Sequence, residues 1–158
     1  MYDKDNNLIK SYPVATGINQ GPKRKTGDNK TPESGNKPFY ISQIQDSSSW
    51  QHDFKDGRGS IPSYGRYFMR LGGTGFNGIG IHGSGDNDAY TGQTGSGFKY
   101  NSEGCIRMKN ADIEDLRKYV GVKTPVYINK QGGILKMAEG NMVPTYDSPF
   151  NKPMEPVV

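Results

Sequence analysis

Alternating apolar and polar positions run through much of the chain and predict short β-strands. The run from Gly78 to His82 places Ile79 and Ile81 on one face of a strand and His82 on the opposite face. The Asp-rich and Asn-rich residues 3–7 are typical of the turn of a hairpin. Further strands are predicted at 8–15, 39–41, 64–71 and 125–128.

Polar stretches rich in glycine or proline separate these strands. Residues 18–38 and 47–60 are predicted to be surface loops by their composition. The stretch 83–101 contains five glycines among polar residues. It is too long for an ordinary connection between strands, and we interpret it as a lid over a site.

A single helix is predicted, at 110–120. Asn110 is a suitable N-cap, acidic residues in the first turn favour the helix dipole, and apolar residues at helical spacing give the helix a buried face. Gly121 is expected to end it. The last segment, 144–158, contains four prolines and is predicted to be extended.

Length and composition favour one domain, 1–158. Only 32% of the residues are apolar, and 22 glycines and 10 prolines disfavour long helices. No apolar stretch approaches the roughly 20 residues of a membrane helix, and the N-terminus lacks a signal-peptide pattern, so any export leader is expected upstream. The net charge is +4, and the basic run Lys23 to Lys25 is expected to be a solvated loop. Nucleic-acid binding is not expected, because no fingerprint of aromatic and basic residues accompanies this charge.

The candidate chemistry centres on the lone cysteine, Cys105. A single cysteine excludes an internal disulfide, and with only two histidines the chain has too few soft ligands for a structural zinc site. Cys105 is therefore either a buried structural residue or a nucleophile, and a nucleophilic thiol needs a neighbouring base. His82, at the end of a buried strand, is the favoured base, whereas His52 in a polar loop is expected to be solvated. Gly104 can leave backbone N–H groups exposed for an oxyanion.

Several ordered motifs carry a resemblance to a known family. Ile81-His82-Gly83, a Gly-rich spacer and Ser102-x-Gly104-Cys105-Ile106-Arg107-Met108 resemble the signature of the L,D-transpeptidase (YkuD-like) family. The stretches 15–17, 27–33 and 64–68 also resemble that family. The family-like core spans about residues 5–130, and 131–158 form a C-terminal extension.

The resemblance implies a mainly β fold, an L,D-transpeptidase-type β-sandwich or barrel with one short α-helix after the catalytic cysteine and a Gly-rich lid. It implies that Cys105 forms a thioester with a peptidoglycan stem peptide and that an amine of a second stem resolves it into a 3-3 cross-link. His82 would be the base, with Gly83 orienting its ring and Gly104 beside the oxyanion. The implied substrate-binding residues are Ser102, Tyr64, Tyr67 and Arg107.

The implied partners follow from that chemistry. They are peptidoglycan stem peptides, with carbapenem-type β-lactams as covalent inhibitors, and no cofactor, metal or nucleic acid is expected. The protein is expected to be a monomer of the bacterial cell envelope, in the periplasm or the cell wall. An active Cys105 of this kind is expected to alkylate faster at pH 7 than a free thiol.

The sequence departs from the family at Glu103, where the family has a histidine. A carboxylate facing the thiolate would oppose it, so we expect the Glu103 side chain to turn toward solvent or a nearby donor. The spacer between His82 and Ser102 is also longer than is usual in the family. Two alternatives stay open: an L,D-carboxypeptidase or endopeptidase on the same site, or a non-catalytic cell-wall-binding module.

Overall fold

The computed structural model describes residues 1–87, 100–129 and 135–137 of the chain. These residues form short strands joined by long loops, as the alternating pattern predicts. The strands are β1 (Thr16–Gly17), β2 (Phe39–Asp46), β3 (Gln51–Asp53), β4 (Ser60–Pro62), β5 (Tyr67–Gly72), β6 (Gly80–His82), β7 (Tyr100–Ser102), β8 (Ile106–Arg107), β9 (Pro125–Ile128) and β10 (Leu135–Met137). The helical elements are the 3-10 turn η1 (Gly85–Asn87) and the α-helix α3 (Asn110–Leu116).

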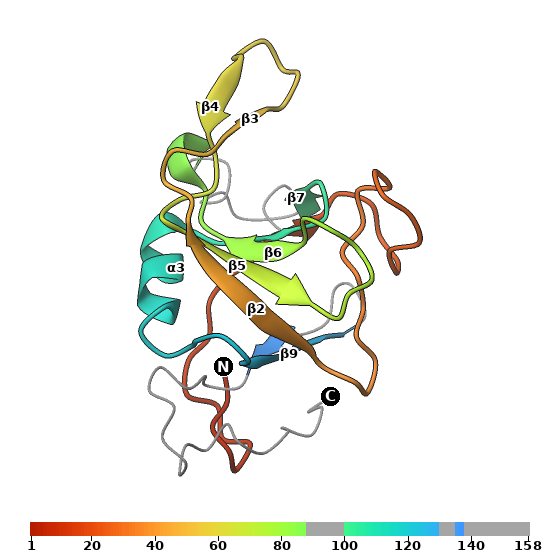
Figure 1. Cartoon of the computed structure of the whole chain (residues 1–158), viewed down its shortest axis with the longest axis vertical. Helices are drawn as coiled ribbons and strands as arrows, with labels where there is room; N and C mark the ends of the chain where they lie inside the picture. Colours follow the sequence, from red (N-terminus) through yellow and green to blue (C-terminus); the bar gives the residue numbers. More distant parts are fainter. Residues whose placement is uncertain (88–99, 130–134, 138–158) are drawn as a thin grey trace.

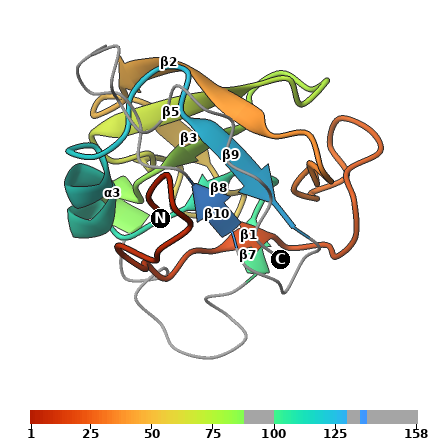
Figure 2. The same cartoon turned by 90° about the horizontal axis from the view of Figure 1, so that it is seen from below.

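A curled six-stranded sheet forms the body of the molecule, in the order β10-β9-β2-β5-β6-β8 (Figures 1 and 2). Its neighbouring strands are antiparallel except for β6 and β8, which run parallel. In this pair Ile81 lies opposite Ile106, and His82 opposite Arg107. The register therefore brings Cys105, one residue before β8, to the strand that carries His82.

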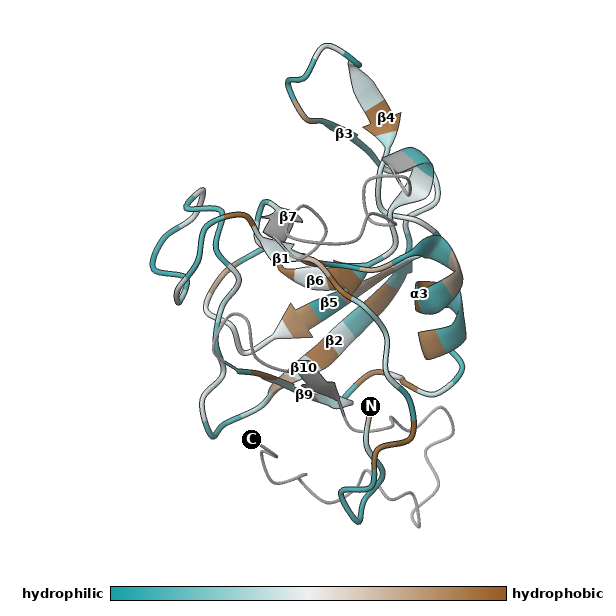
Figure 3. Ribbon diagram, turned by 180° about the vertical axis from the view of Figure 1, so that it is seen from behind, coloured by the Kyte–Doolittle hydropathy of each residue, from teal (hydrophilic) through white to brown (hydrophobic). Residues whose placement is uncertain are grey.

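The core lies between this sheet, α3 and the β8–β9 connection. Ile41, Met69, Ile81 and Ile106 are fully buried, and the inward face of α3 contributes buried apolar side chains to the same cluster. Figure 3 shows hydrophobic residues on the strands and on one side of α3. A helix as short as α3 is not stable by itself, and the burial of its apolar face in the core stabilises it. The prediction of a mainly β fold with one short helix is confirmed for the described residues.

The prediction that Asn110 caps its own helix is wrong. The N-cap residue is Lys109, which makes no side-chain cap hydrogen bond, and the helix ends at Leu116 rather than at residue 120. The Asn110 Oδ1 instead accepts hydrogen bonds from the N–H groups of Ser84 (2.9 Å) and Gly85 (2.8 Å). Asn110 therefore braces the segment that follows His82.

The N-terminal segment also differs from its prediction. The turn at 3–7 is present, since the Asp3 carboxylate accepts hydrogen bonds from the Asp5 and Asn7 N–H groups. The strand expected at 8–15 is reduced to two isolated bridges, Tyr2 to Leu8 and Ala15 to Arg107. The Leu8 side chain is 58% exposed and does not pack into the core.

Two other predictions concern loops. The stretch 47–60, predicted to be a loop, contains β3 and begins β4, which form the hairpin that rises above the sheet in Figure 1. Most of the lid predicted at 83–101 lies outside the described residues.

Within the described ranges, no helix is long and apolar enough to cross a membrane.

Candidate active site

A cleft of about 290 Å3 opens where the β3–β4 hairpin meets strands β5 and β6 and the Cys105 segment. It contains four aromatic rings besides two histidines and a free thiol. The lining residues are Trp50, His52, Phe54, Ser63, Tyr64, Phe68, Arg70, Gly78, His82, Ser102, Glu103, Cys105 and Arg107. The candidate nucleophile and both candidate bases therefore share one cleft.

Cys105 is a free, partly buried thiol directly before β8. Its Sγ donates a hydrogen bond to the carbonyl oxygen of Gly78 at 3.2 Å. Burial raises the pKa of the Cys105 thiol to about 11, although the cationic Arg70 and Lys23 act in the opposite direction. The thiol is therefore protonated at neutral pH in the unliganded protein.

His82 is 4% exposed and held on two sides. Its Nδ1 lies 2.5 Å from the carbonyl oxygen of Gly83, and its ring stacks on Phe68 with centroids 5.5 Å apart. Burial lowers the pKa of His82 to about 3, so the ring is neutral. Because a carbonyl only accepts, Nδ1 carries the proton and Nε2 is left with a lone pair, as a base requires.

The resting pair is thus a neutral thiol and a neutral imidazole in one cleft. Each side chain makes its hydrogen bond to a backbone carbonyl, Cys105 to Gly78 and His82 to Gly83. A thiol with a raised pKa holds little thiolate at pH 7. The unliganded Cys105 is therefore expected to alkylate more slowly than a free thiol, which reverses the expectation from sequence.

The backbone around Cys105 is held by Ser102. The Ser102 hydroxyl donates to the Cys105 carbonyl and accepts from the Gly104 N–H at 3.1 Å. Gly104 has φ +132°, a conformation that side chains rarely adopt, and its carbonyl accepts from the Thr31 hydroxyl at 2.9 Å. Ser102 is 4% exposed and lines the cleft, but its hydrogen bonds brace the cysteine loop.

The other predicted substrate-binding residues separate into two groups. Arg107 is 4% exposed, lines the cleft, and places its guanidinium 5.6 Å from the centre of the Phe54 ring. Tyr64 also lines the cleft, and its ring lies 4.9 Å from that of His82. Tyr67 is not among the described residues that line the cleft; its ring instead contacts the guanidiniums of Arg66 and Arg117.

The Glu103 side chain turns toward a nearby donor, His52. Its Oε2 lies 3.2 Å from the Nε2 of His52, and its side chain stays 61% exposed. His52 is supplied by β3, so this contact joins the hairpin to the cysteine segment. The expectation that His52 is merely solvated is wrong.

Among the residues that line the cleft, Arg70 was not singled out from the sequence, and His52 was set aside as a solvated loop residue. A signal was present for Arg70: it shares a strand face with Phe68, and Phe68 lies opposite His82 in the sheet. His52 gave no comparable signal, because its partner Glu103 lies 51 positions further along the chain. Within the described ranges, no cluster of three or more His, Cys, Asp or Glu side chains could hold a metal.

Comparison with known proteins decides the family. The family model of the L,D-transpeptidase catalytic domain, YkuD, matches residues 1–128. The chain belongs to this L,D-transpeptidase family. A solved L,D-transpeptidase from Mycobacterium smegmatis is similar at 18% identity and a TM-score of 0.49, over 79% of this chain and 51% of that one. The chain thus spans about half the length of that protein, and no curated protein sequence matches it.

Within the L,D-transpeptidase family, Glu103 is the departure with a testable consequence. A Glu103→Gln variant removes the carboxylate that raises the thiol pKa, but this charge is mostly exposed and screened by solvent. We expect the rate of Cys105 alkylation at pH 8 to rise by less than about fivefold. Iodoacetamide kinetics followed by mass would measure this. A rise of two orders of magnitude would mean that Glu103 controls the thiol.

The buried neutral His82 predicts acid-sensitive stability. Its pKa is about 3 in the folded state and about 6.5 in the unfolded chain, so acid protonates only the unfolded form. Above pH 6.5 His82 is neutral in both states, and its burial does not lower the free energy of unfolding. As the pH falls, protonation of His82 in the unfolded chain lowers the free energy of unfolding, by about 2 kcal/mol at pH 5. Urea unfolding at pH 7 and pH 5 would measure it. A His82→Gln variant should lose most of this pH dependence, and equal pH dependence in both proteins would contradict the assignment.

Proposed function

We propose that this chain is an L,D-transpeptidase that joins peptidoglycan stem peptides through a thioester on Cys105. The family acts on peptidoglycan peptides and is associated with the cell wall. The observation that carries the proposal is the shared cleft, in which a neutral His82 with Nδ1 bound to Gly83 faces the same space as the thiol. The non-catalytic alternative has less support, because Glu103 contacts His52.

In the first half-reaction, His82 Nε2 takes the thiol proton as Cys105 leaves its bond to Gly78 and rotates toward the substrate. The sulfur attacks the carbonyl carbon between the diamino acid at position three of the stem and the following D-alanine. The carbon–nitrogen bond then breaks, and His82 returns its proton to the departing amine. The product is a thioester and free D-alanine.

The developing oxyanion needs backbone donors. The Gly104 N–H already donates to Ser102, so we assign the oxyanion first to the N–H of Cys105, with Gly104 shaping the approach. Removing such a donor typically costs about 3 kcal/mol in the transition state.

In the second half-reaction, an amine of a second stem attacks the thioester and gives its proton to His82. The carbon–sulfur bond breaks, His82 passes this proton to the departing sulfur, and a 3-3 cross-link is formed. Water in place of the amine would yield an L,D-carboxypeptidase. Arg107 suits a substrate carboxylate because its guanidinium is a planar fork. Tyr64 lines the cleft beside His82, whereas Tyr67 is left out of the proposed substrate site.

The expected inhibitors, assembly and location follow from this chemistry. Carbapenem-type β-lactams would acylate Cys105, since their strained carbonyl meets the same nucleophile. We propose that the protein acts as a monomer in the bacterial cell envelope.

Product analysis tests the proposal. The protein is incubated with a tetrapeptide stem and a labelled acceptor stem, and the products are separated and weighed. Labelled dimers with release of D-alanine support a transpeptidase. Tripeptide without dimers would establish the carboxypeptidase instead, and unchanged substrates with a folded protein would favour the binding module.

A further inference from the structure

The basic run that the sequence predicts as solvated contains a buried lysine. Lys23 is only 4% exposed at its side chain, and its Nζ pairs with Asp28 Oδ1 at 2.8 Å. The neighbouring residues Arg24 and Lys25 are exposed. An ammonium is rarely buried unless it is paired. The ion pair with Asp28 therefore holds Lys23 in a buried position that the composition of its loop did not predict.

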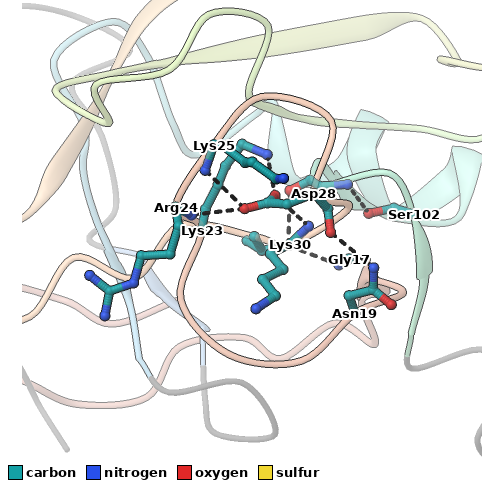
Figure 4. A network of polar contacts seen from close by, with 10 residues as sticks. Gly17, Asn19, Lys23, Arg24, Lys25, Asp28, Lys30 and Ser102 are labelled. Carbon is teal, nitrogen blue, oxygen red and sulfur yellow. Dashed lines mark hydrogen bonds and ion pairs between the residues drawn. The ribbon is translucent and has the colours of Figure 1, made fainter.

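Asp28 organises the loop that presents Lys23. Its carboxylate accepts hydrogen bonds from Lys23 Nζ and from three backbone N–H groups, at 2.8 to 3.1 Å. Figure 4 shows this carboxylate surrounded by Lys23, Arg24, Lys25 and Lys30. Burial works to raise the pKa of Asp28, but these bonds outweigh it and lower the pKa, so the carboxylate stays charged. Four donors share its negative charge, which leaves the nearby ammonium incompletely neutralised.

The ammonium lies behind the cysteine loop. A side-chain carbon placed on Gly104 would be 3.7 Å from Lys23 Nζ and 2.9 Å from the Lys30 carbonyl oxygen. Thr31, at the end of the same loop, donates to the Gly104 carbonyl at 2.9 Å. Lys23 is not among the described residues that line the cleft, so it acts through the Gly104–Cys105 backbone rather than by touching substrate.

We propose that Lys23, held by Asp28, is a positioning residue that supplies positive charge behind Gly104 and favours the thiolate of Cys105. This inference rests on the proposed function, in which Cys105 is the nucleophile. It gives the site a cation where the Gly104 N–H is already bound to Ser102. A fixed cation beside a thiol favours its charged form, and it costs no reorganisation when charge develops.

Other charged or titratable groups surround the thiol. Arg70 from β5 adds positive charge, and Glu103 adds negative charge. His52, His82, Tyr64 and Arg107 line the same cleft. Lys23 differs from the cleft cations because substrate cannot displace or screen it. Its effect should therefore persist in the free protein and in the presence of salt.

The pH profile of Cys105 alkylation tests this role. Cys105 is the only cysteine, so iodoacetamide gives one site and one mass shift. Lys23→Met should move the midpoint of the profile upward by about half a pH unit or more and slow alkylation at pH 8 by about threefold or more. Lys23→Arg should restore most of the wild-type profile. Lys25→Met, in the same loop but exposed, is the matched control and should change nothing.

A second variant guards against misfolding. Lys23→Met leaves the Asp28 charge without its partner, so the double variant Lys23→Met/Asp28→Asn removes both charges together. It should fold, as urea unfolding would show, and should shift the midpoint upward by less than the single variant does, because the opposing charge of Asp28 is removed as well. A folded single or double variant with a wild-type alkylation profile would overturn the proposal. Because the readout uses no stem peptide, failure of the proposed transpeptidase activity would leave this test unaffected.

Discussion

A His82→Gln variant is expected to fold and to lose about three orders of magnitude in the rate of Cys105 acylation at pH 7. Glutamine can keep a hydrogen bond to the Gly83 carbonyl, but it cannot take the thiol proton. The thiol has a pKa of about 11, so it depends on a base at neutral pH. Stopped-flow or mass-resolved acylation by a carbapenem would measure the loss.

The pH dependence of that loss distinguishes a base from a structural residue. In His82→Gln the rate should rise about tenfold per pH unit toward the pKa of the thiol, because thiolate forms without help, so the defect shrinks at high pH. His52→Gln is the matched control, since it removes the other imidazole of the cleft, and it should stay within about fivefold of wild type. Equal rates for wild type and His82→Gln at pH 7 would remove His82 from the mechanism.

Gly104→Ala is expected to destabilise the protein by about 1 to 3 kcal/mol and to lower acylation by about a hundredfold or more. The backbone there has φ +132°, and an added carbon would lie 2.9 Å from the Lys30 carbonyl oxygen. Either Gly104 or the 23–31 loop must shift, and Cys105 shifts with it. Urea unfolding and carbapenem acylation would measure the two effects separately.

Gly35→Ala provides the control for this prediction. Gly35 also has a positive φ, +60°, but nothing lies within 4 Å of the position that an added carbon would occupy. It should therefore show only a modest backbone cost, about 1 to 2 kcal/mol, with unchanged acylation. An active Gly104→Ala, or an inactive Gly35→Ala, would contradict the claim that close packing at Gly104 places the nucleophile.

The parts of the site that follow local patterns could be predicted from sequence. The alternation at Gly78 to His82 predicted a strand with His82 opposite its apolar face, and β6 with His82 stacked on Phe68 agrees. These features depend on neighbouring residues, which the sequence displays directly.

The remaining features depend on contacts between distant segments. The burial of Lys23 depends on a loop that closes over the Gly104 backbone, and composition alone suggested solvent. His52 reaches the cleft because β3 pairs with β4. The polar composition of residues 47–60, where β3 lies and β4 begins, did not predict these strands. Asn110 looked like a cap, yet its side chain is used by Ser84 and Gly85. The pKa of Cys105 likewise reflects burial by surrounding residues rather than its motif.

The most direct test of a nucleophilic Cys105 is the intact mass of the protein after incubation with a tetrapeptide stem or a carbapenem, compared with Cys105→Ala. Wild type should gain one acyl group, as the stem less its D-alanine or as the intact carbapenem, and Cys105→Ala should gain none. No adduct on folded wild-type protein with either reagent, or an equal adduct on Cys105→Ala, would contradict the account.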